Sequence, residues 1–286
     1  EAARKYGPDR VGVFLGTSTS GILQAELAYR QRASVTGALP EAFDYQSTQN
    51  SFSPAEFTRA YLGLEGMAMA VSTACSSSAK VFAAAARHLA LGTIDAAVVG
   101  GVDTLCLTTL HGFASLQLTS PRPCKPYDAM RDGISIGEGA AFALLERVAP
   151  SSSAPGSVLL VGVGESSDAY HMSAPHPEGL GARLAMQAAL KSANLSADDV
   201  GYINLHGTAT PANDAAEGQA VMALFGDRVP CSSTKGATGH TLGAAGALEA
   251  VFCAIALTDA HLPGSPGTEH LDPATPLRYL MQSRAE

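Results

Sequence analysis

The hydrophobic positions of this chain fall into short apolar runs that alternate with longer stretches carrying an apolar residue every three or four positions. The short runs predict buried strands, and the longer stretches predict helices packed against them. In the first half, strands are predicted at residues 11–15, 67–72, 95–99 and 140–146. Helices are predicted at 22–32, from Ser53 with Pro54 at the first helical position, and at 76–91, with polar, irregular segments at 33–54 and 120–138.

The second half repeats this alternation. Strands are predicted at 158–163, 201–205 and 229–232, and helices at 181–193, 212–225 and 242–257. Strands alternating with helices are typical of an α/β fold. The Pro-, Ser- and Gly-rich segment 150–157 is the best linker. We therefore expect two domains, 1–149 and 158–286, as related halves of one duplicated fold, although no clear sequence repeat connects them.

Composition bounds the class of protein. Hydrophobic residues make up 46% of the 286 residues and charged residues only 15%, which predicts a sizeable core. We expect no apolar stretch long and uninterrupted enough to span a bilayer. The N-terminus lacks the basic and then apolar pattern of a signal peptide. The expected location is the cytoplasm.

The formal net charge of −8 argues against nucleic acid as the main partner, because such domains usually carry a basic excess. It does not exclude an acidic protein partner. The five cysteines are scattered, odd in number and without a C-x-x-C pair. A disulfide framework or a structural zinc site is therefore not expected.

Cys75 is the first candidate for chemistry, because it lies between a predicted strand and a predicted helix that starts at Ser76. A thiol with a pKa of roughly 8.5 is only about 3% thiolate at neutral pH. A helix N-terminus would favour the thiolate by about 0.3–1 kcal/mol, and its amides could hold a thioester oxyanion. The competing interpretation is a small core residue, which is the better one for the other four cysteines.

His206 and His240 are the second candidates. His206 follows a predicted strand, and His240 lies between a strand and a helix, each next to a glycine. Ligand sites of α/β folds lie at strand ends, where these two residues can converge. Taken alone, each histidine is more often a structural residue. A metal site is a further alternative, but no third ligand accompanies them at suitable spacing.

Taken together, these segments closely resemble the active-site motifs of the β-ketoacyl-acyl carrier protein synthases, the elongating ketosynthases of the thiolase-like superfamily. The matching segments occur in the family's order and approximate spacing, from about Val11 to Leu280. They are Val-Ser-Thr-Ala-Cys-Ser-Ser-Ser at 71–78, Arg-Asp-Gly at 131–133 with Gly-Glu-Gly at 137–139, Gly-Glu-Ser-Ser-Asp-Ala-Tyr-His at 164–171, His-Gly-Thr-Ala-Thr at 206–210 with Asp214, and Lys-Gly-Ala-Thr-Gly-His at 235–240.

The resemblance implies a reaction and a role for each matching residue. Cys75 would take an acyl group from a carrier-protein thioester, and His206 and His240 would stabilise the enolate left when a malonyl thioester loses carbon dioxide. Lys235 and Glu249 resemble the family's supporting charged residues.

The remaining matches concern the substrate. Thr208 and Thr210 match pantetheine-contacting positions, with Asp214 in the same motif. No cofactor is implied beyond the phosphopantetheine carried by the acyl carrier protein. The implied fold is a layered α-β-α-β-α arrangement of two related halves, and family members are usually dimers or ketosynthase heterodimers.

Several positions depart from the family. Its opening strand and its closing Gly-Phe-Gly-Gly loop have no counterpart, so we expect a central portion lacking both chain ends. Ile134 stands where elongating members commonly carry Phe, and Cys124 stands where an aromatic residue is frequent, which predicts a non-standard acyl pocket. The segment 104–126 is most similar to ketosynthases of aryl polyene or other specialised polyketide pathways.

Other functions compete with the condensing-enzyme interpretation. A non-catalytic partner of the chain-length-factor type usually lacks the nucleophile, which argues against it here. A thiolase would need a second cysteine in a C-terminal glycine motif, and initiation synthases pair histidine with asparagine. The Gly-Ile-Ser-Ile-Gly segment around Ser135 fits the serine-hydrolase pattern, but apolar residues flank the serine and a strand is predicted after it. The glycine-bounded loop at 16–21 lacks the lysine of a nucleotide-binding loop.

Overall fold

The computed structural model describes the chain except for residues 149–153, 155, 172–173 and 286. The described chain divides into two compact units. Unit 1 comprises Glu1–Leu116, Ile136–Ala154 and Thr241–Val251. Unit 2 comprises Gln117–Ser135, Pro155–His240 and Phe252–Glu286.

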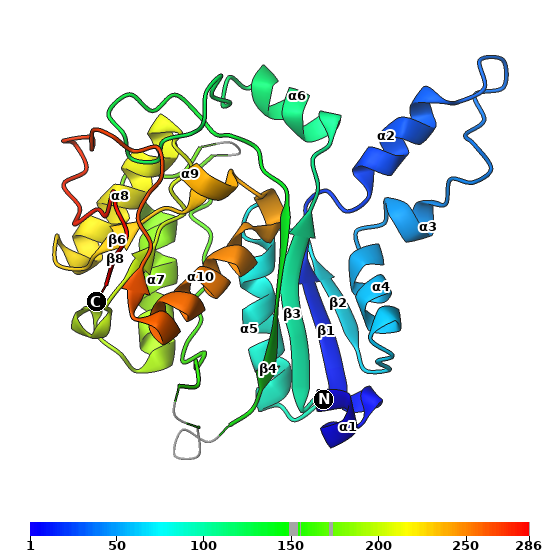
Figure 1. Cartoon of the computed structure of the whole chain (residues 1–286), viewed down its shortest axis with the longest axis horizontal. Helices are drawn as coiled ribbons and strands as arrows, with labels where there is room; N and C mark the ends of the chain where they lie inside the picture. The colour runs from blue at the N-terminus through cyan, green and yellow to red at the C-terminus, as the bar shows by residue number, and fades with distance from the viewer. Residues whose placement is uncertain (149–153, 155, 172–173, 286) are drawn as a thin grey trace. The chain divides into compact units, whose positions relative to one another are not determined.

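Unit 1 is built on a four-stranded sheet of order β2-β1-β3-β4 (Figure 1). Its strands are β1 (Val11–Gly16), β2 (Ala68–Val71), β3 (Ala96–Asp103) and β4 (Gly139–Glu146). The first three strands are parallel, and β4 runs antiparallel to β3. Because α5 (Ser77–Ala90) connects β2 to β3, the predicted β-α-β unit around the cysteine is present.

Alternate side chains of β1 enter two different cores. Phe14 packs against α5 together with Val81 and Leu89. The residues on either side of Phe14 point the other way, and Val13 packs with Ala55 of α4 (Ser53–Tyr61). This alternation is the two-residue period of a strand that is buried on both faces, which explains why the segment is continuously apolar in the sequence.

The remaining helices of unit 1 are short. They are α1 (Ala2–Tyr6), the 3-10 turn Pro8–Arg10, α2 (Ile22–Arg30), α3 (Tyr45–Thr48), α6 (Leu107–Ser115), the 3-10 turn Leu242–Ala244 and the first part of α10 (Ala245–Asp259). The predicted helices α2, α4 and α5 are confirmed, whereas α3 and α6 were not predicted. Asp44 caps α3 by accepting the backbone N–H groups of Gln46 and Ser47. This helix was not predicted because the surrounding segment is polar and has no apolar periodicity.

Unit 2 carries the second set of elements. Its larger helices are α7 (Leu180–Ala193), α8 (Pro211–Phe225) and the end of α10, accompanied by the 3-10 turn Ala197–Asp199 and α9 (Lys235–Thr238). Its strands are the parallel pair β5 (Ile203–Asn204) and β6 (Cys231–Ser232) and the antiparallel pair β7 (His261–Leu262) and β8 (Arg284–Ala285). A core containing Leu205, Val221, Phe225 and Tyr127 packs around β5 and β6. The strands at 201–205 and 229–232 are therefore shorter than predicted.

The predicted strand at 158–163 is wrong. No strand pairing is assigned to this segment within the described residues, and four consecutive apolar side chains there are exposed, Val161 by 58%. The segment packs closely on α7, since a Cβ at Gly162 would lie 2.7 Å from the Ala189 carbonyl oxygen. An apolar run forms a strand only beside a hydrogen-bonded neighbour. The proposed linker at 150–157 lies largely outside the described residues.

One helical segment is long and apolar enough to be compared with a membrane span. Residues 242–259 form a helical stretch of 18 residues with a mean hydropathy of 1.5, long and apolar enough to cross a bilayer by these measures alone. One third of this stretch is buried, and Glu249 lies within it. Core helices of globular proteins reach the same length and hydropathy, so these two properties do not identify a membrane span.

Candidate active site

Cys75 lies at the turn between β2 and α5 of unit 1, directly before the helix N-cap Ser76. The turn is tight, because Ala74 has a positive φ of 54°. The Ala74 carbonyl oxygen accepts the Ser77 hydroxyl at 2.6 Å and the Ser18 hydroxyl at 3.1 Å. The predicted placement of the cysteine at a strand-to-helix turn is confirmed, and its side chain is partly exposed.

Asp103 supports this turn and was not predicted. Its carboxylate is 1% exposed and accepts the Thr17 hydroxyl at 2.6 Å, the Ser18 backbone N–H at 2.8 Å and the Gly243 backbone N–H at 2.6 Å. These bonds order the loop from which Ser18 reaches Ala74. The sequence signal for Asp103 was its position: it is a carboxylate at the carboxyl end of a central strand, two residues after Gly101 in β3.

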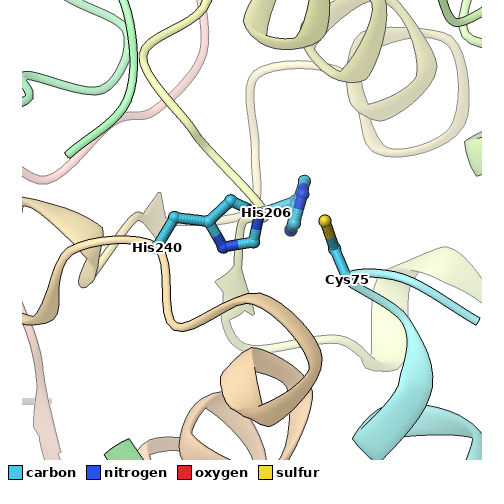
Figure 2. Close-up of side chains that lie close together, drawn as sticks. All are labelled: Cys75, His206 and His240. Atoms are coloured by element: carbon cyan, nitrogen blue, oxygen red, sulfur yellow. The ribbon is translucent and has the colours of Figure 1, made fainter. Parts of the chain in front are cut away.

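His206 and His240 come together within unit 2. Their ring centroids are 5.1 Å apart and their planes are nearly perpendicular, at 85° (Figure 2). His206 follows β5 by two residues, and His240 follows the short helix α9 that comes after β6. His206 thus lies just beyond the carboxyl end of β5, as predicted, whereas α9, which was not predicted, separates His240 from the end of the neighbouring parallel strand β6. His240 is almost fully buried, at 3% exposure.

Lys235 adds a positive charge to this pair. Its Nζ lies 3.3 Å from Nδ1 of His206, and the residue is 2% exposed. A protonated lysine has only donors, so Nδ1 of His206 must act as the acceptor. The ring proton of neutral His206 then sits on Nε2. The predicted supporting lysine is thus placed where it can select one tautomer of the histidine.

Both imidazoles are held neutral. Burial, followed by the charge of Lys235 and by repulsion from His240 when that ring is protonated, places the pKa of His206 well below its ordinary value. Burial and then Lys235 lower the pKa of His240 from 6.5 to about 3. A neutral imidazole carries one N–H donor, so this pair can donate hydrogen bonds to an oxygen that gains negative charge without first losing protons.

Glu217 anchors the His206 loop and was also not predicted. Its carboxylate accepts the backbone N–H groups of His206 at 2.6 Å and Gly207 at 2.8 Å, and the Tyr127 hydroxyl at 3.0 Å. Burial raises the pKa of Glu217 from 4.5 to about 7. Its sequence signal was a second carboxylate, three residues after Asp214 in a helix otherwise rich in Ala.

Asp214, Thr208 and Thr210 form the turn that follows His206. Asp214 is fully buried and accepts backbone N–H groups of Thr208 at 3.0 Å, Ala209 at 3.2 Å and Tyr127 at 2.8 Å. The hydroxyls of Thr208 and Thr210 are 2.9 Å apart. Asp214 therefore shapes the loop, and the contacts of all three residues with pantetheine stay predictions.

Ile134 and Ser135 lie in an extended segment that bridges to Thr119. Ile134 is 3% exposed, and its backbone N–H donates to the Leu118 carbonyl at 2.8 Å. Its role in an acyl pocket stays a prediction. Ser135 is not on a strand-to-helix turn, because β4 begins four residues later. The serine-hydrolase interpretation of this segment is therefore excluded by the local structure.

A pocket of about 180 Å³ opens beside the histidine loop in unit 2. Its lining includes Asp168, Gly179, Gly181, His206, Asn213 and Glu217. The pocket gives one histidine access to a small ligand.

Glu249 lies on α10 in unit 1 and is partly buried, and its predicted supporting role stays a prediction. Figure 2 draws the two histidine rings together with Cys75 of unit 1.

Family models match nearly the whole chain. The model of the β-ketoacyl synthase N-terminal domain matches residues 2–151, and that of the β-ketoacyl synthase C-terminal domain matches residues 158–269.

Curated relatives point the same way. The chain is 43% identical over 209 residues to 3-oxoacyl-[acyl-carrier-protein] synthase 2 of Rhizobium meliloti strain 1021, covering 68% of this chain and 49% of the relative. It is 35% identical over 270 residues to Nodulation protein E of Rhizobium meliloti, covering 92% of this chain and 66% of the relative. The chain thus spans about half to two thirds of the length of these relatives.

A solved structure resembles the chain over nearly its whole length. This is the ketosynthase ApeO in complex with its chain length factor ApeC from Xenorhabdus doucetiae, with a TM-score of 0.88 and 42% identity, covering 99% of this chain and 70% of that one. A β-ketoacyl synthase from Burkholderia phymatum STM815 gives a TM-score of 0.86 at 32% identity and covers 97% of this chain and 70% of that one. The predicted α/β, thiolase-like fold is confirmed by these similarities.

Proposed function

Because the chain belongs to the β-ketoacyl synthase family, we propose that it catalyses the decarboxylative condensation of an acyl group with a malonyl thioester, in fatty acid or polyketide biosynthesis. The observation that carries this proposal is the pair of neutral imidazoles with Lys235 against one of them. In this proposal Cys75 of unit 1 is the nucleophile. Because Cys75 accepts an acyl group and passes it on, the protein would be an acyltransferase.

In the first step, the Cys75 sulfur attacks the carbonyl carbon of an acyl thioester. The new carbon–sulfur bond forms as the bond to the donor's thiol breaks, so the acyl group moves to the protein and the donor leaves as a free thiol. The position of Cys75 before the first turn of α5 supports this step, because unpaired backbone N–H groups at a helix N-terminus favour both a thiolate and an oxyanion.

In the second step, a malonyl thioester loses carbon dioxide. The electron pair of the broken carbon–carbon bond becomes an enolate, whose charge rests largely on the thioester oxygen. His206 and His240 would donate to that oxygen, and each such donor is typically worth about 2.7–4 kcal/mol of the barrier. Two neutral donors suit this task because they stabilise a charge that is absent from the ground state.

In the third step, the enolate carbon attacks the carbonyl carbon of the acyl-Cys75 thioester. A carbon–carbon bond forms and the bond to the Cys75 sulfur breaks, which releases the Cys75 thiolate. A proton from water restores the thiol, and the β-ketoacyl product leaves on the pantetheine that carried the malonyl group. A single nucleophile is therefore reused in each cycle. Ile134 would contribute to the cavity that holds the acyl chain, which makes it a candidate determinant of chain length.

The acyl carrier protein is the proposed partner, with Thr208 and Thr210 contacting the pantetheine arm and Asp214 holding their loop. No resident cofactor or metal is required by this chemistry. We further propose that the chain acts in the cytoplasm, as a dimer with a second copy or with a chain-length-factor subunit. A relative that is 42% identical was solved with such a subunit, which favours the heterodimer. An aryl polyene or other specialised polyketide pathway stays a prediction.

Mass spectrometry tests the proposal directly. The protein is incubated with a panel of acyl N-acetylcysteamine thioesters and then with malonyl-N-acetylcysteamine, both soluble mimics of pantetheine thioesters. We expect a mass increase equal to one acyl group on the peptide containing Cys75, followed by release of the β-ketoacyl thioester and carbon dioxide. Absence of both the acyl adduct and the condensed product across the panel would refute the proposed function and favour a non-catalytic partner.

A second measurement tests whether Cys75 joins the histidines. In the His206→Cys variant, a short reagent with two thiol-reactive groups should link the introduced thiol at position 206 to Cys75, as seen in the peptide map. The same variant carrying Cys75→Ala is the matched control. Labelling of the two thiols singly, without a cross-linked peptide, would count against a shared site.

A further inference from the structure

Ser135 holds the backbone of His240 through a hydrogen bond that lies outside the helices and strands. The His240 backbone N–H donates to the Ser135 carbonyl oxygen at 2.7 Å, a short hydrogen bond between two backbone groups. The two residues are far apart in the sequence, but both belong to unit 2. Any movement of the Ser135 backbone therefore moves the residue that carries the imidazole.

The Ser135 side chain fixes that backbone in turn. Its hydroxyl oxygen accepts the Cys124 backbone N–H at 2.9 Å and donates to the Arg122 carbonyl at 3.4 Å. Ser135 is thus tied to the loop at 122–124 through its side chain and to His240 through its main chain. The hydroxyl that gave a hydrolase-like pattern in the sequence is occupied by backbone partners.

Cys124 holds the other end of the same histidine loop. Its thiol donates to the Lys235 carbonyl oxygen at 3.2 Å, and this carbonyl also accepts the Gly239 backbone N–H at 2.9 Å. The short helix α9, which runs from Lys235 to the residue before Gly239, is therefore held at its start by Cys124 and just after its end by Ser135. Cys124 is 2% exposed, which protects this contact from water.

We infer that Ser135 and Cys124 are positioning residues that fix His240 and Lys235 for the condensation chemistry, Ser135 through the His240 backbone and Cys124 through the Lys235 carbonyl. This inference rests on the proposed function for its catalytic consequence, but the geometry that it describes does not. The departure from the family pattern at Cys124 then belongs to a local arrangement that supports the histidine loop.

The test compares Ser135→Ala with Ser196→Ala. Ser196 also bonds through its hydroxyl, to Asp199 in the capping box of the 3-10 turn at 197–199, but contacts neither histidine. Both variants should unfold at a lower temperature. Only Ser135→Ala should lower the rate of carbon dioxide release from malonyl-N-acetylcysteamine, by about 10- to 100-fold, because misplacement of a catalytic group by about 1 Å costs on that order. Acyl loading of Cys75 should stay within about twofold of wild type.

The second pair of variants is Cys124→Ala and Cys124→Ser. A serine hydroxyl can still donate to the Lys235 carbonyl, so Cys124→Ser should recover most of the decarboxylation rate that Cys124→Ala loses. Rates that are equally low in both variants, with both folded, would overturn the role of the thiol. If Ser135→Ala fails to fold, Ser135→Thr takes its place. Ser135→Thr keeps the hydroxyl, and this variant together with the two Cys124 variants then tests whether residues 124 and 135 position the histidine loop.

A structural readout separates this inference from the proposed function. In protein labelled with ¹⁵N-histidine, the ring resonances of His240 should move in Ser135→Ala and stay at their wild-type positions in Ser196→Ala. Unchanged His240 resonances and an unchanged decarboxylation rate in folded Ser135→Ala would overturn the inference. If wild-type protein released no carbon dioxide at all, the proposed function would fail, whereas the resonance comparison would still test the positioning.

Discussion

Nζ of Lys235 lies 3.3 Å from Nδ1 of His206, deep inside unit 2. Burial is the largest cause of the lowered pKa of His206, and the charge of Lys235 lowers this pKa further. The contact also assigns the ring proton to Nε2, since an ammonium group can only donate. Lys235 therefore helps to keep His206 neutral and sets the direction of the hydrogen bond that His206 can offer to a substrate.

Replacement of Lys235 by Met should break this control while keeping most of the side-chain volume. We expect the pKa of His206 to rise, because one of the two charges that lower it is removed, and the two neutral tautomers to become mixed. Decarboxylation should fall by roughly 100-fold, the typical cost of losing one well-placed donor. ¹⁵N ring shifts of His206 measured against pH would report the tautomer, and shifts identical to wild type would contradict the assignment.

Cys75→Ala should abolish acyl transfer to the protein and leave the fold intact. The expected result is loss of the acyl adduct in the intact mass, with an unchanged far-ultraviolet circular dichroism spectrum. Cys253→Ala is the matched control, because Cys253 is also only partly buried but lies on α10, away from any strand-to-helix turn. Retention of the adduct in Cys75→Ala would remove this residue from the role of nucleophile.

His206→Ala and His240→Ala should each slow malonyl decarboxylation by on the order of 100-fold or more, since each removes one donor to the enolate oxygen. The double variant should lose less than the product of the two single losses, because groups that act on one oxygen are not additive. Carbon dioxide release is the measurement. A variant that releases carbon dioxide at the wild-type rate would exclude that histidine from the stabilisation of the enolate.

Local sequence patterns singled out Cys75, His206 and His240 as candidates, and the resemblance of the combined motifs to a family gave them their roles. Cys75 stands out because a strand pattern, a turn and a helix pattern follow one another within a few residues. His206 and His240 stand out because each follows a predicted strand. In each case the informative neighbours are adjacent in the sequence, and the structure confirms their placement on these elements.

The supporting residues were missed because their partners are distant in the sequence. Asp103 binds the backbone of Gly243, which lies 140 residues further along the chain, and Ser135 binds that of His240. Such pairs are set by tertiary packing, which a pattern of apolar positions does not encode. The wrong strand at 158–163 has the same origin, because its composition is typical of a strand but pairing depends on a neighbour elsewhere.

Asp103→Ala should destabilise the protein strongly. It removes the acceptor of the Thr17 hydroxyl and of the backbone N–H groups of Ser18 and Gly243, and unsatisfied buried polar groups cost about 1–3 kcal/mol each. We expect the free energy of unfolding to fall by at least about 3 kcal/mol. Urea unfolding is the measurement, with Asp9→Ala at an exposed position as control. A loss below about 1 kcal/mol would contradict the supporting role of Asp103.

The dependence of stability on pH should carry opposite contributions from His240 and Glu217. His240 has a folded pKa of about 3 against 6.5 when unfolded, so the folded state binds fewer protons between these values. Its contribution is present above pH 6.5 and is lost as the pH falls. Glu217 has a folded pKa of about 7 against 4.5, so its contribution is present below pH 4.5 and is lost as the pH rises towards 7 and above.

Between pH 6.5 and 4.5 these two groups therefore work against each other, and substitution should separate them. His240→Gln should reduce the loss of stability on acidification by about 1.4 kcal/mol per pH unit relative to wild type, whereas Glu217→Gln should increase it by a similar amount. The free energy of unfolding in urea, measured at half-unit intervals of pH, gives both slopes. Because the two variants must change the slope in opposite directions, a change of the same sign in both would show that burial does not set the pKa values of this site as described.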